Sequence, residues 1–257
     1  MKNSWSGFLL AWQFFSAVPI KKQLDMNAKS VTWMYGFLPV VGLLMGSIIG
    51  SGVLILSHYS DISDLLLAIL IVMGFIILTG GLHLDGWIDM SDAFFSYGDK
   101  EKRLEILDDP RTGAFGVISV FCLLVLKIGV IYEMLSHGQL AVVPFLVFIP
   151  FLARTGMLLY FVTMQPAKEK GLAAYFKGII IQNKLAVLIV FQSLLAFGCW
   201  FYMGVFSLFI LYIAMLIAVV IYRKWSKKHF GGVTGDLLGA FGEGMEVVLW
   251  LTILLCI

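Results

Sequence analysis

Acidic residues crowd together directly after a long apolar run, in the stretch GGLHLDGWIDMSDAFFSYGD at residues 80–99. If this stretch continues the helix before it, Asp85, Asp89 and Asp92 fall at i, i+4 and i+7, within an arc of about 60° on one face. Three carboxylates on one face repel one another unless a cation lies among them. Oxygen ligands of this kind suit Mg²⁺, Mn²⁺ or Ca²⁺. The spacing predicts a divalent metal site, and the competing interpretation is a row of solvated charges beyond a helix end.

A second acidic group lies near the end of the chain, in GGVTGDLLGAFGEGME at residues 231–246. Asp236 and Glu243 are seven positions apart and share a helical face, so they are further candidate metal ligands. The five glycines between residues 231 and 242 argue against a simple packed helix and for close approach to a ligand. Backbone N–H groups of such a segment can bind phosphate. The candidate substrate-binding residues here are Gly232, Thr234 and Gly235. The alternative is a glycine-lined helix contact with incidental acids.

Two arginines, Arg111 and Arg154, are candidates for binding an anionic substrate or partner. Arg111 follows Asp109 in the motif DDPRTGAFG, and its guanidinium is a fixed fork suited to phosphate. Arg154 lies inside a long apolar run, where an unpaired charge is costly, so it should face an anionic partner or ligand. Snorkelling of Arg154 to the membrane surface is the alternative. Arg111 is therefore a candidate catalytic residue, and Asp109 and Arg154 are candidate substrate-binding residues.

These residues must be positioned by helices that cross a membrane. The chain has 257 residues, of which 60% are hydrophobic and 13% charged, and its mean hydropathy is +0.96. A soluble domain carries about twice that charged fraction. Several apolar runs are continuous and long enough to cross a hydrocarbon core about 30 Å thick, whereas a β-barrel would show short alternating segments. The composition predicts an all-α, polytopic membrane protein.

Seven apolar runs predict transmembrane helices. Their bounds are close to 33–57, 63–82, 115–135, 139–163, 185–203, 205–222 and 244–257. The earlier stretch at 5–20 is too short to span comfortably and stops at Pro19, so it is predicted to form an interfacial or re-entrant helix. No internal repeat or linker divides the sequence. Residues 1–257 are therefore predicted to form a single integral membrane domain.

The basic residues are segregated along the chain. Sixteen of the eighteen Lys and Arg residues lie in four segments, at 1–32, 83–114, 164–184 and 223–243. With seven spans these segments all fall on one side of the membrane, which should be the cytoplasmic side because cytoplasmic loops carry an excess of Lys and Arg. The segment at 83–114 nevertheless holds eight acidic residues against four basic ones. The candidate chemistry is thus predicted at the cytoplasmic face of the cell membrane.

The candidate residues fit one kind of reaction. Carboxylates can hold one or two divalent ions that bridge a pyrophosphate, and arginines can neutralise its other oxygens while a hydroxyl attacks in line. Membrane enzymes that move phosphate-linked groups onto alcohols need this arrangement at the bilayer surface. The lipid bilayer is therefore an expected partner.

Several motifs together resemble a known family. GGLHLDGWIDMSDAFFS, followed by a charged helix and DDPRTGAFGV, is similar to the motif of the cobalamin synthase (adenosylcobinamide-GDP ribazoletransferase) family. GGVTGDLLGAFGEGMEV resembles the C-terminal glycine-rich motif of that family, and FLLAWQFFSAVPI and EKGLAAYF are in keeping with it. The resemblance covers nearly the whole chain. Pro110 and Trp87 depart from the family's usual residues, but neither removes a charged side chain.

The resemblance implies a Mg²⁺-dependent phosphotransferase that completes the nucleotide loop of vitamin B12. Such an enzyme joins adenosylcobinamide-GDP to α-ribazole or its 5′-phosphate and releases GMP. The metal ligands it implies are Asp85, Asp89, Asp92, Asp236 and Glu243. Either Asp89 or Asp92 is expected to take the proton of the attacking hydroxyl, while Arg111 and Arg154 stabilise the phosphate charge.

Two other functions stay open. A CDP-alcohol phosphotransferase also carries an Asp-rich membrane helix, but in the order D-x-x-D-G-x-x-A-R. Here a glycine follows the first Asp, and no Ala-Arg pair occurs at that distance. A cation-coupled transporter more often buries its acids near the midplane, within repeated halves. No nucleic-acid partner is expected, and a homo-oligomer and a complex with other corrinoid-assembly enzymes are open alternatives.

Overall fold

The computed structural model describes residues 2–96, 98–203 and 206–256, without the side chains of residues 199–203. The described residues form helices joined by short connections, and no β-strand occurs among them. One isolated bridge pairs Pro166 with Val233. The predicted all-α fold is confirmed.

The helices fall into a long and a short group. The long helices are α3 (Leu38–Tyr59), α4 (Asp64–Thr79), α7 (Ala114–Ser136), α8 (Val143–Thr163), α10 (Gln182–Met203), α11 (Phe206–Phe230) and α12 (Gly235–Leu254), and the 3₁₀ turn η1 (Gln139–Val142) leads into α8. The short helices are α1 (Lys2–Phe15), α2 (Ala28–Gly36), α5 (Leu82–Phe95), α6 (Lys100–Leu107) and α9 (Leu172–Ile179).

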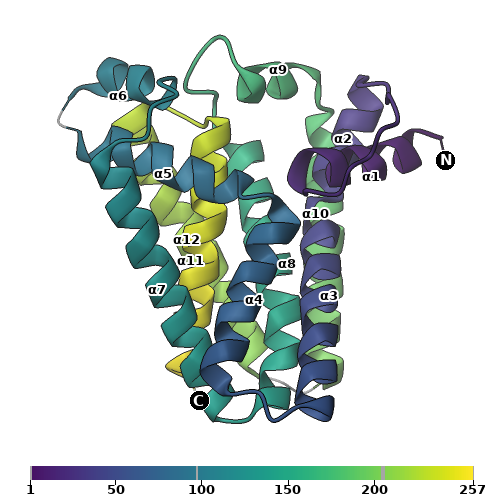
Figure 1. Ribbon diagram of the computed structural model, residues 1–257. Coiled ribbons are helices and arrows are strands. Elements are labelled where there is room, and N and C mark those ends of the chain that lie inside the picture. Colours follow the sequence, from purple (N-terminus) through teal and green to yellow (C-terminus); the bar gives the residue numbers. More distant parts are fainter. Residues whose placement is uncertain (1, 97, 204–205, 257) are drawn as a thin grey trace.

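The long helices form the body of the molecule and run roughly along one direction (Figure 1). Among the described residues, five of them are long and apolar enough to cross a membrane alone: α3, α7, α8 with η1, α11 and α12. Two further pairs, α4 with α5 and α9 with α10, are bent by 92° and 94° at short breaks. Counting each pair as one crossing gives seven, so the prediction of a polytopic helical membrane protein is confirmed.

Three predicted runs have clearly different bounds in the structure, and one of them, predicted to end at 222, continues in α11 to Phe230. The run at 33–57 is divided, because α2 ends at Gly36 and α3 starts with Pro39 in its first turn. Proline is tolerated in a first turn and not in a helix interior. The last run begins at Gly235, well before its predicted start. Residues 204–205 and 257, at the edges of the predicted runs, lie outside the described residues.

A sharp elbow at two glycines separates α4 from α5. Gly80 and Gly81 have φ angles of 66° and 75°, in the left-handed region that glycine enters at little cost. The aspartates therefore do not continue the preceding helix, although Asp85, Asp89 and Asp92 still share one separate helix, α5. The chain turns by 92°, and α5 runs across the bundle near its charged end, beside the first turns of α12 (Figure 1).

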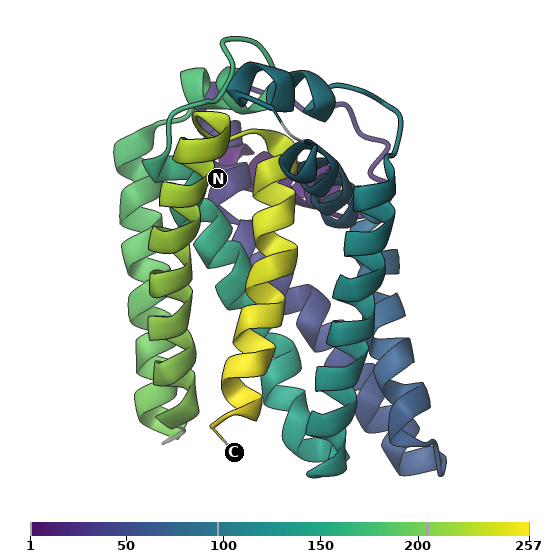
Figure 2. The same cartoon turned by 90° about the vertical axis from the view of Figure 1, so that its left-hand side faces the viewer.

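The Lys- and Arg-rich segments lie together at one end of the bundle. Helices α1, α2, α5, α6 and α9 are all at this end, as is the turn between α11 and α12 (Figures 1 and 2). The connections that lack Lys and Arg lie at the other end. The predicted segregation of the basic segments to one side of the molecule is confirmed, and α1 lies across that end as expected of an interfacial helix.

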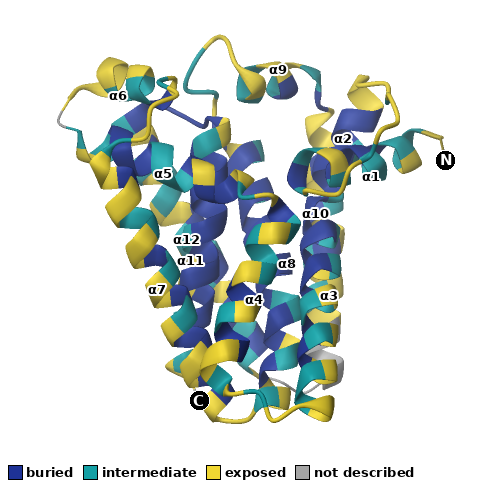
Figure 3. Ribbon diagram, in the orientation of Figure 1, coloured by how far each residue is buried: buried dark blue, intermediate teal, exposed yellow. Residues whose placement is uncertain are grey.

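The bundle buries its interior through close helix contacts and leaves its outer faces apolar. Buried residues line the inner sides of α8 and α12, while the outward side of α7 is exposed (Figure 3). Phe121 and Val125 on α7 are 67% and 53% exposed, as expected of side chains that face lipid. Gly46 on α3 packs against the backbone of Leu146 on α8, and such small residues let membrane helices approach closely.

Candidate active site

Helix α5 lies directly on the first turns of α12, backbone against backbone. A Cβ atom on Gly86 would lie only 2.6 Å from the carbonyl oxygen of Asp236, and one on Gly239 would lie 3.2 Å from the Cα of His83. These glycines therefore permit the contact between two segments that are far apart in the sequence. The contact brings the first acidic group and Asp236 together at the charged end of the bundle, as the sequence predicts.

The carboxylates that meet there form a concentration of negative charge. Asp85 is exposed, and Asp89 and Asp236 are half-buried. Burial raises the pKa of Asp89 to about 6, and the charges of Asp85, Asp236 and Asp92 add to the increase. No basic side chain among the described residues forms an ion pair with Asp85 or Asp89. The charges of Asp85 and Asp89 are therefore not balanced by an ion pair within the described part of the protein.

The donor atoms of this acidic group, rather than an enclosed geometry, are of the kind that a hard cation binds. No three Asp, Glu, His or Cys side chains in the described part of the chain are close enough to enclose an ion by themselves. Mg²⁺ is commonly bound by one or two carboxylates, with water and substrate phosphate oxygens completing its shell. The all-oxygen donors and the uncompensated charge of Asp85, Asp89 and Asp236 fit such an ion.

Asp92 is turned away from this group and fixes the start of α7. It is buried, its Oδ2 accepts a hydrogen bond from the N–H of Gly113 at 2.7 Å, and its Oδ1 accepts one from the N–H of Gly116 at 2.8 Å. A carboxylate at a helix N-terminus is stabilised by the helix dipole. Asp92 thus ties α5 to α7 with both oxygens, a contact that helical spacing alone does not reveal.

Arg111 and Asp109 form a pair at the rim of the site. The guanidinium donates from Nε to Asp109 Oδ1 at 2.9 Å and from Nη2 to Oδ2 at 2.6 Å. These bonds lower the pKa of Asp109 to about 2. The Arg111 side chain is 86% exposed, so the pair is open to solvent and the structure does not bring it into contact with the aspartates of α5.

The glycine-rich segment before α12 packs against the backbone of residues 165–167. The N–H of Val233 donates to the carbonyl of Gln165 at 2.9 Å, and the N–H of Ala167 donates to the carbonyl of Val233 at 3.0 Å. A Cβ on Gly232 would collide with the backbone of residues 165–167. Gly232 therefore serves this backbone contact, and the structure shows no phosphate-binding role for it.

Thr234 caps α12, and the helix then runs through the remaining glycines. Its Oγ1 accepts a hydrogen bond from the N–H of Leu237 at 3.1 Å and lies 3.5 Å from Asp236 Oδ2. Gly235 is exposed, with open space where a side chain would be. The expectation that the glycines argue against a packed helix is wrong for Gly239 and Gly242, which lie within α12 and pack against His83 of α5 and Met157 of α8.

The structure adds a basic residue to the site that the sequence did not single out. Lys168 directly follows Ala167, whose N–H donates to the carbonyl of Val233. The positive charge of Lys168 interacts electrostatically with the carboxylate of Asp236. Its Nζ lies 2.6 Å from Asp108 Oδ2 and donates to the carbonyl of Leu104 at 3.0 Å. Lys168 is one of four lysines in its segment, and nothing in the sequence distinguishes it from the others.

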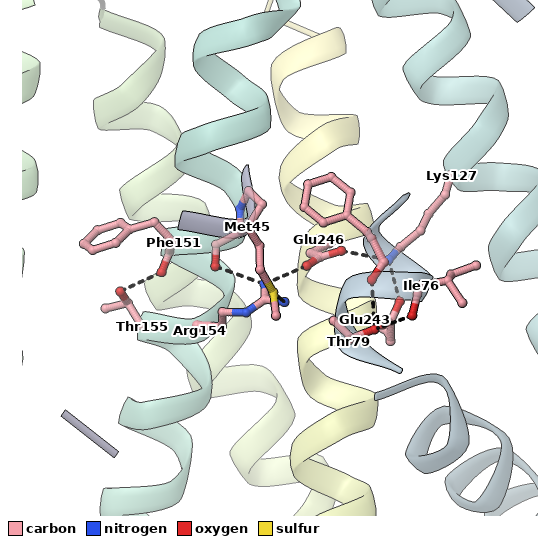
Figure 4. Close-up of polar contacts among 11 residues, drawn as sticks. Met45, Ile76, Thr79, Lys127, Phe151, Arg154, Thr155, Glu243 and Glu246 are labelled. Carbon is pink, nitrogen blue, oxygen red and sulfur yellow. Dashed lines mark hydrogen bonds and ion pairs between the residues drawn. The ribbon is translucent and has the colours of Figure 1, made fainter. Parts of the chain in front are cut away.

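Arg154 and Glu243 lie inside the bundle and away from the aspartates of α5. Glu243 Oε2 pairs with Lys127 Nζ at 2.5 Å, and Arg154 Nη1 donates to Glu246 Oε1 at 3.0 Å (Figure 4). The prediction that Arg154 has an anionic partner is confirmed. The structure does not bring Arg154 to a substrate surface or Glu243 to Asp85 and Asp89.

Comparison with known proteins gives matches along nearly the whole chain. The family model described as cobalamin-5-phosphate synthase matches residues 7–254. The chain is 42% identical over 253 residues to the adenosylcobinamide-GDP ribazoletransferase of Geobacillus sp. (strain WCH70), covering 97% of this chain and 95% of the relative. It is 37% identical to the enzyme of that name from Geobacillus kaustophilus (strain HTA426), with the same coverage, and 32% identical to that from Clostridioides difficile (strain 630), covering 97% of each. No solved structure matches the chain.

Proposed function

Because the chain belongs to the cobalamin-5-phosphate synthase family, we propose that it is a membrane-bound adenosylcobinamide-GDP ribazoletransferase. It would transfer the cobinamide-phosphate group of adenosylcobinamide-GDP to α-ribazole or its 5′-phosphate and release GMP, the nucleotide-loop assembly step of cobalamin biosynthesis. The family match over residues 7–254 carries this proposal. The meeting of Asp85, Asp89 and Asp236 at one end of the bundle supports it, because a pyrophosphate substrate needs a cation there.

The proposed reaction is an in-line displacement at phosphorus. The ribazole hydroxyl oxygen forms a new bond to the phosphorus that carries cobinamide. The bond from that phosphorus to the pyrophosphate bridging oxygen breaks, and its electron pair leaves with GMP. Asp89 accepts the hydroxyl proton, because both oxygens of the other candidate base, Asp92, already accept backbone hydrogen bonds from Gly113 and Gly116.

Asp85, Asp89 and Asp236 would hold Mg²⁺ at the mouth of the site. When bound, the ion supplies a positive charge that polarises phosphate oxygens and orients the pyrophosphate. Asp92 keeps its backbone partners and positions the loop before α7. Glu243 is left out of the ligand set because Lys127 occupies one of its oxygens inside the bundle.

Two basic residues would bind the remaining phosphate oxygens. Lys168 lies beside Asp236, on the loop that pairs with the segment before α12. Arg111 presents an exposed guanidinium at the rim, and a guanidinium binds phosphate with two parallel hydrogen bonds. Both cations now pair with carboxylates of the loop before α7, Lys168 with Asp108 and Arg111 with Asp109, and each would exchange that partner for phosphate.

The direct test is GMP release by the purified protein in proteoliposomes. We expect GMP from adenosylcobinamide-GDP only when α-ribazole and Mg²⁺ are both present, and none after EDTA treatment. Asp89→Asn should reduce the rate by about 10² to 10⁴, the usual contribution of a general base. The matched control is Asp61→Asn, an exposed aspartate between α3 and α4 at the opposite end of the bundle. GMP release without α-ribazole, or full activity of Asp89→Asn, would contradict the proposal.

A further inference from the structure

Four charged side chains are buried inside the bundle, where the proposed reaction does not use them. Lys127, Arg154, Glu243 and Glu246 are all more than nine-tenths buried, and we call them the interior charge cluster. Lys127 Nζ contacts Glu243 Oε2 at 2.5 Å and Glu246 Oε2 at 2.9 Å, and Arg154 Nη1 contacts Glu246 Oε1 at 3.0 Å (Figure 4). Two positive and two negative charges balance one another.

Glu246 is the hub of this cluster because its two oxygens bind cations from two different helices. Lys127 comes from α7, Arg154 from α8, and Glu246 from α12. Arg154 passes close to α3, where only the absence of a side chain on Gly42 leaves room for its stem. Rotating α12, or sliding it by one turn, would break both contacts of Glu246 at once.

Such a cluster is a costly means of holding helices together. A buried ion pair contributes little net stability compared with apolar side chains of similar volume, while removal of one partner leaves an uncompensated charge. The best-attested gain from a buried polar group is specification of register. The interior charge cluster is therefore expected to specify how α7, α8 and α12 are aligned along one another.

The cluster links the two helices that support α5, because Lys127 lies in α7 and Glu243 and Glu246 lie in α12. Glu243 is seven residues along α12 from Asp236, about 10 Å at 1.5 Å per residue. Lys127 is eleven residues along α7 from Gly116, about 16 Å by the same rise. Asp236 carries the backbone contact with Gly86, and Gly116 donates to Asp92. Helix α5 is thus held on one side by α12 and on the other by α7, and the cluster joins these two supports.

We propose that the interior charge cluster, with Glu246 as its hub, is a positioning device that sets the affinity of the acidic site for its divalent cation. It fixes α12 against α7 and α8 so that Asp236 faces Asp85 and Asp89. The cluster touches neither the cation nor the substrate. The inference rests on the proposed metal site, and cation binding without substrate tests it separately from the transfer reaction.

The test is Mn²⁺ titration of the purified protein, followed by electron paramagnetic resonance with no substrate present. Glu246→Gln removes the hub charge at nearly constant volume. We expect its Mn²⁺ dissociation constant to rise about threefold to thirtyfold, the range for residues that couple to a site without contacting it. Lys127→Arg keeps the charge and can reach both carboxylates, so it should retain affinity close to that of the unaltered protein.

A matched control separates positioning from general destabilisation. Leu249→Ala truncates a fully buried apolar side chain on α12, one turn beyond Glu246. It should lower the melting temperature at least as much as Glu246→Gln while leaving Mn²⁺ affinity unchanged. If Glu246→Gln does not yield folded protein, Glu246→Asp provides the test, because it keeps the charge and shortens the bridge by one methylene. Its Mn²⁺ affinity should fall in the same direction.

Two results would overturn the inference. One is unchanged Mn²⁺ affinity in folded Glu246→Gln or Glu246→Asp, and the other is an equal loss of affinity in Leu249→Ala. Absence of Mn²⁺ binding by the unaltered protein would overturn both the inference and the metal site. If Mn²⁺ binds and responds to Glu246→Gln while no GMP is released, the proposed reaction fails and the positioning role stands.

Discussion

At the scale of single residues, helical spacing identified the acidic side chains better than it identified their partners. Asp85, Asp89 and Asp92 share one stripe, yet Asp92 turns both oxygens to backbone N–H groups of α7. Spacing within one helix contains no information about which neighbouring helix lies against it. For the same reason the sequence indicated that Arg154 needs an anion, without indicating that Glu246 supplies it.

Lys168 provides a test of phosphate binding at this scale. Lys168→Gln should raise the KM for adenosylcobinamide-GDP about tenfold or more, the effect of losing one hydrogen bond to a charged group. The change should be larger in KM than in kcat, because the residue is proposed to bind the pyrophosphate in the ground state as well. The measurement is initial-rate kinetics in proteoliposomes.

The matched control for Lys168 is its neighbour Lys170. Lys170 lies in the same loop, is exposed and has no ion-pair partner among the described residues, so Lys170→Gln removes the same charge from the same segment. The KM of Lys170→Gln should stay within about twofold of the KM of the unaltered protein, a difference that we regard as neutral. An equal effect of the two substitutions would indicate that only the overall charge of the loop matters.

At the scale of elements, the seven apolar runs could be predicted and the elbow before α5 could not. Continuous hydrophobicity identifies a crossing because the bilayer interior imposes it on every residue. The glycine pair Gly80 and Gly81 is visible in the sequence, and only the positive φ angles of the two residues reveal a turn. The glycines of α12 were interpreted as evidence against a packed helix. In the structure they are helical, and Gly239 lies against His83 of α5.

The contact between α5 and α12 gives a prediction for Gly86. Gly86→Ala would place a Cβ atom 2.6 Å from the carbonyl oxygen of Asp236, so α5 must move away. We expect a stability loss of about 1 to 3 kcal/mol, as for overpacking, together with weaker Mn²⁺ binding. Thermal unfolding and Mn²⁺ titration measure the two effects.

Gly129→Ala is the matched control for Gly86→Ala. Gly129 lies in α7 with open space around the position of an added Cβ. Alanine there should be neutral or mildly stabilising because it favours the helix. If both substitutions leave Mn²⁺ binding unaltered, close packing of α5 on α12 is not required for the site.

At the scale of the whole molecule, the charge distribution assigns a side to the site. All four basic segments lie at the end that carries α5, and the positive-inside tendency predicts that this end faces the cytoplasm. The net-negative segment at 83–114 lies there too, where a charged, soluble substrate would arrive. This prediction of orientation requires only the number of crossings and the positions of Lys and Arg in the sequence.

Cysteine labelling of intact cells tests this orientation. In a background without Cys122, Cys199 and Cys256, Lys170→Cys should react with a membrane-impermeant maleimide only after permeabilisation. Ser60→Cys, in the connection between α3 and α4, should react without it. The reverse pattern would place the site outside the cytoplasm and separate it from cytoplasmic substrates.

We propose that carboxylates from two distant segments bind one divalent cation at the charged end of the bundle. The decisive measurement is Mn²⁺ binding by Asp236→Asn, followed by electron paramagnetic resonance, with Asp61→Asn as the control at the other end. Asp236→Asn should lose Mn²⁺ binding as severely as Asp89→Asn, while Asp61→Asn should bind Mn²⁺ normally. Unaltered Mn²⁺ affinity in folded Asp236→Asn would contradict it.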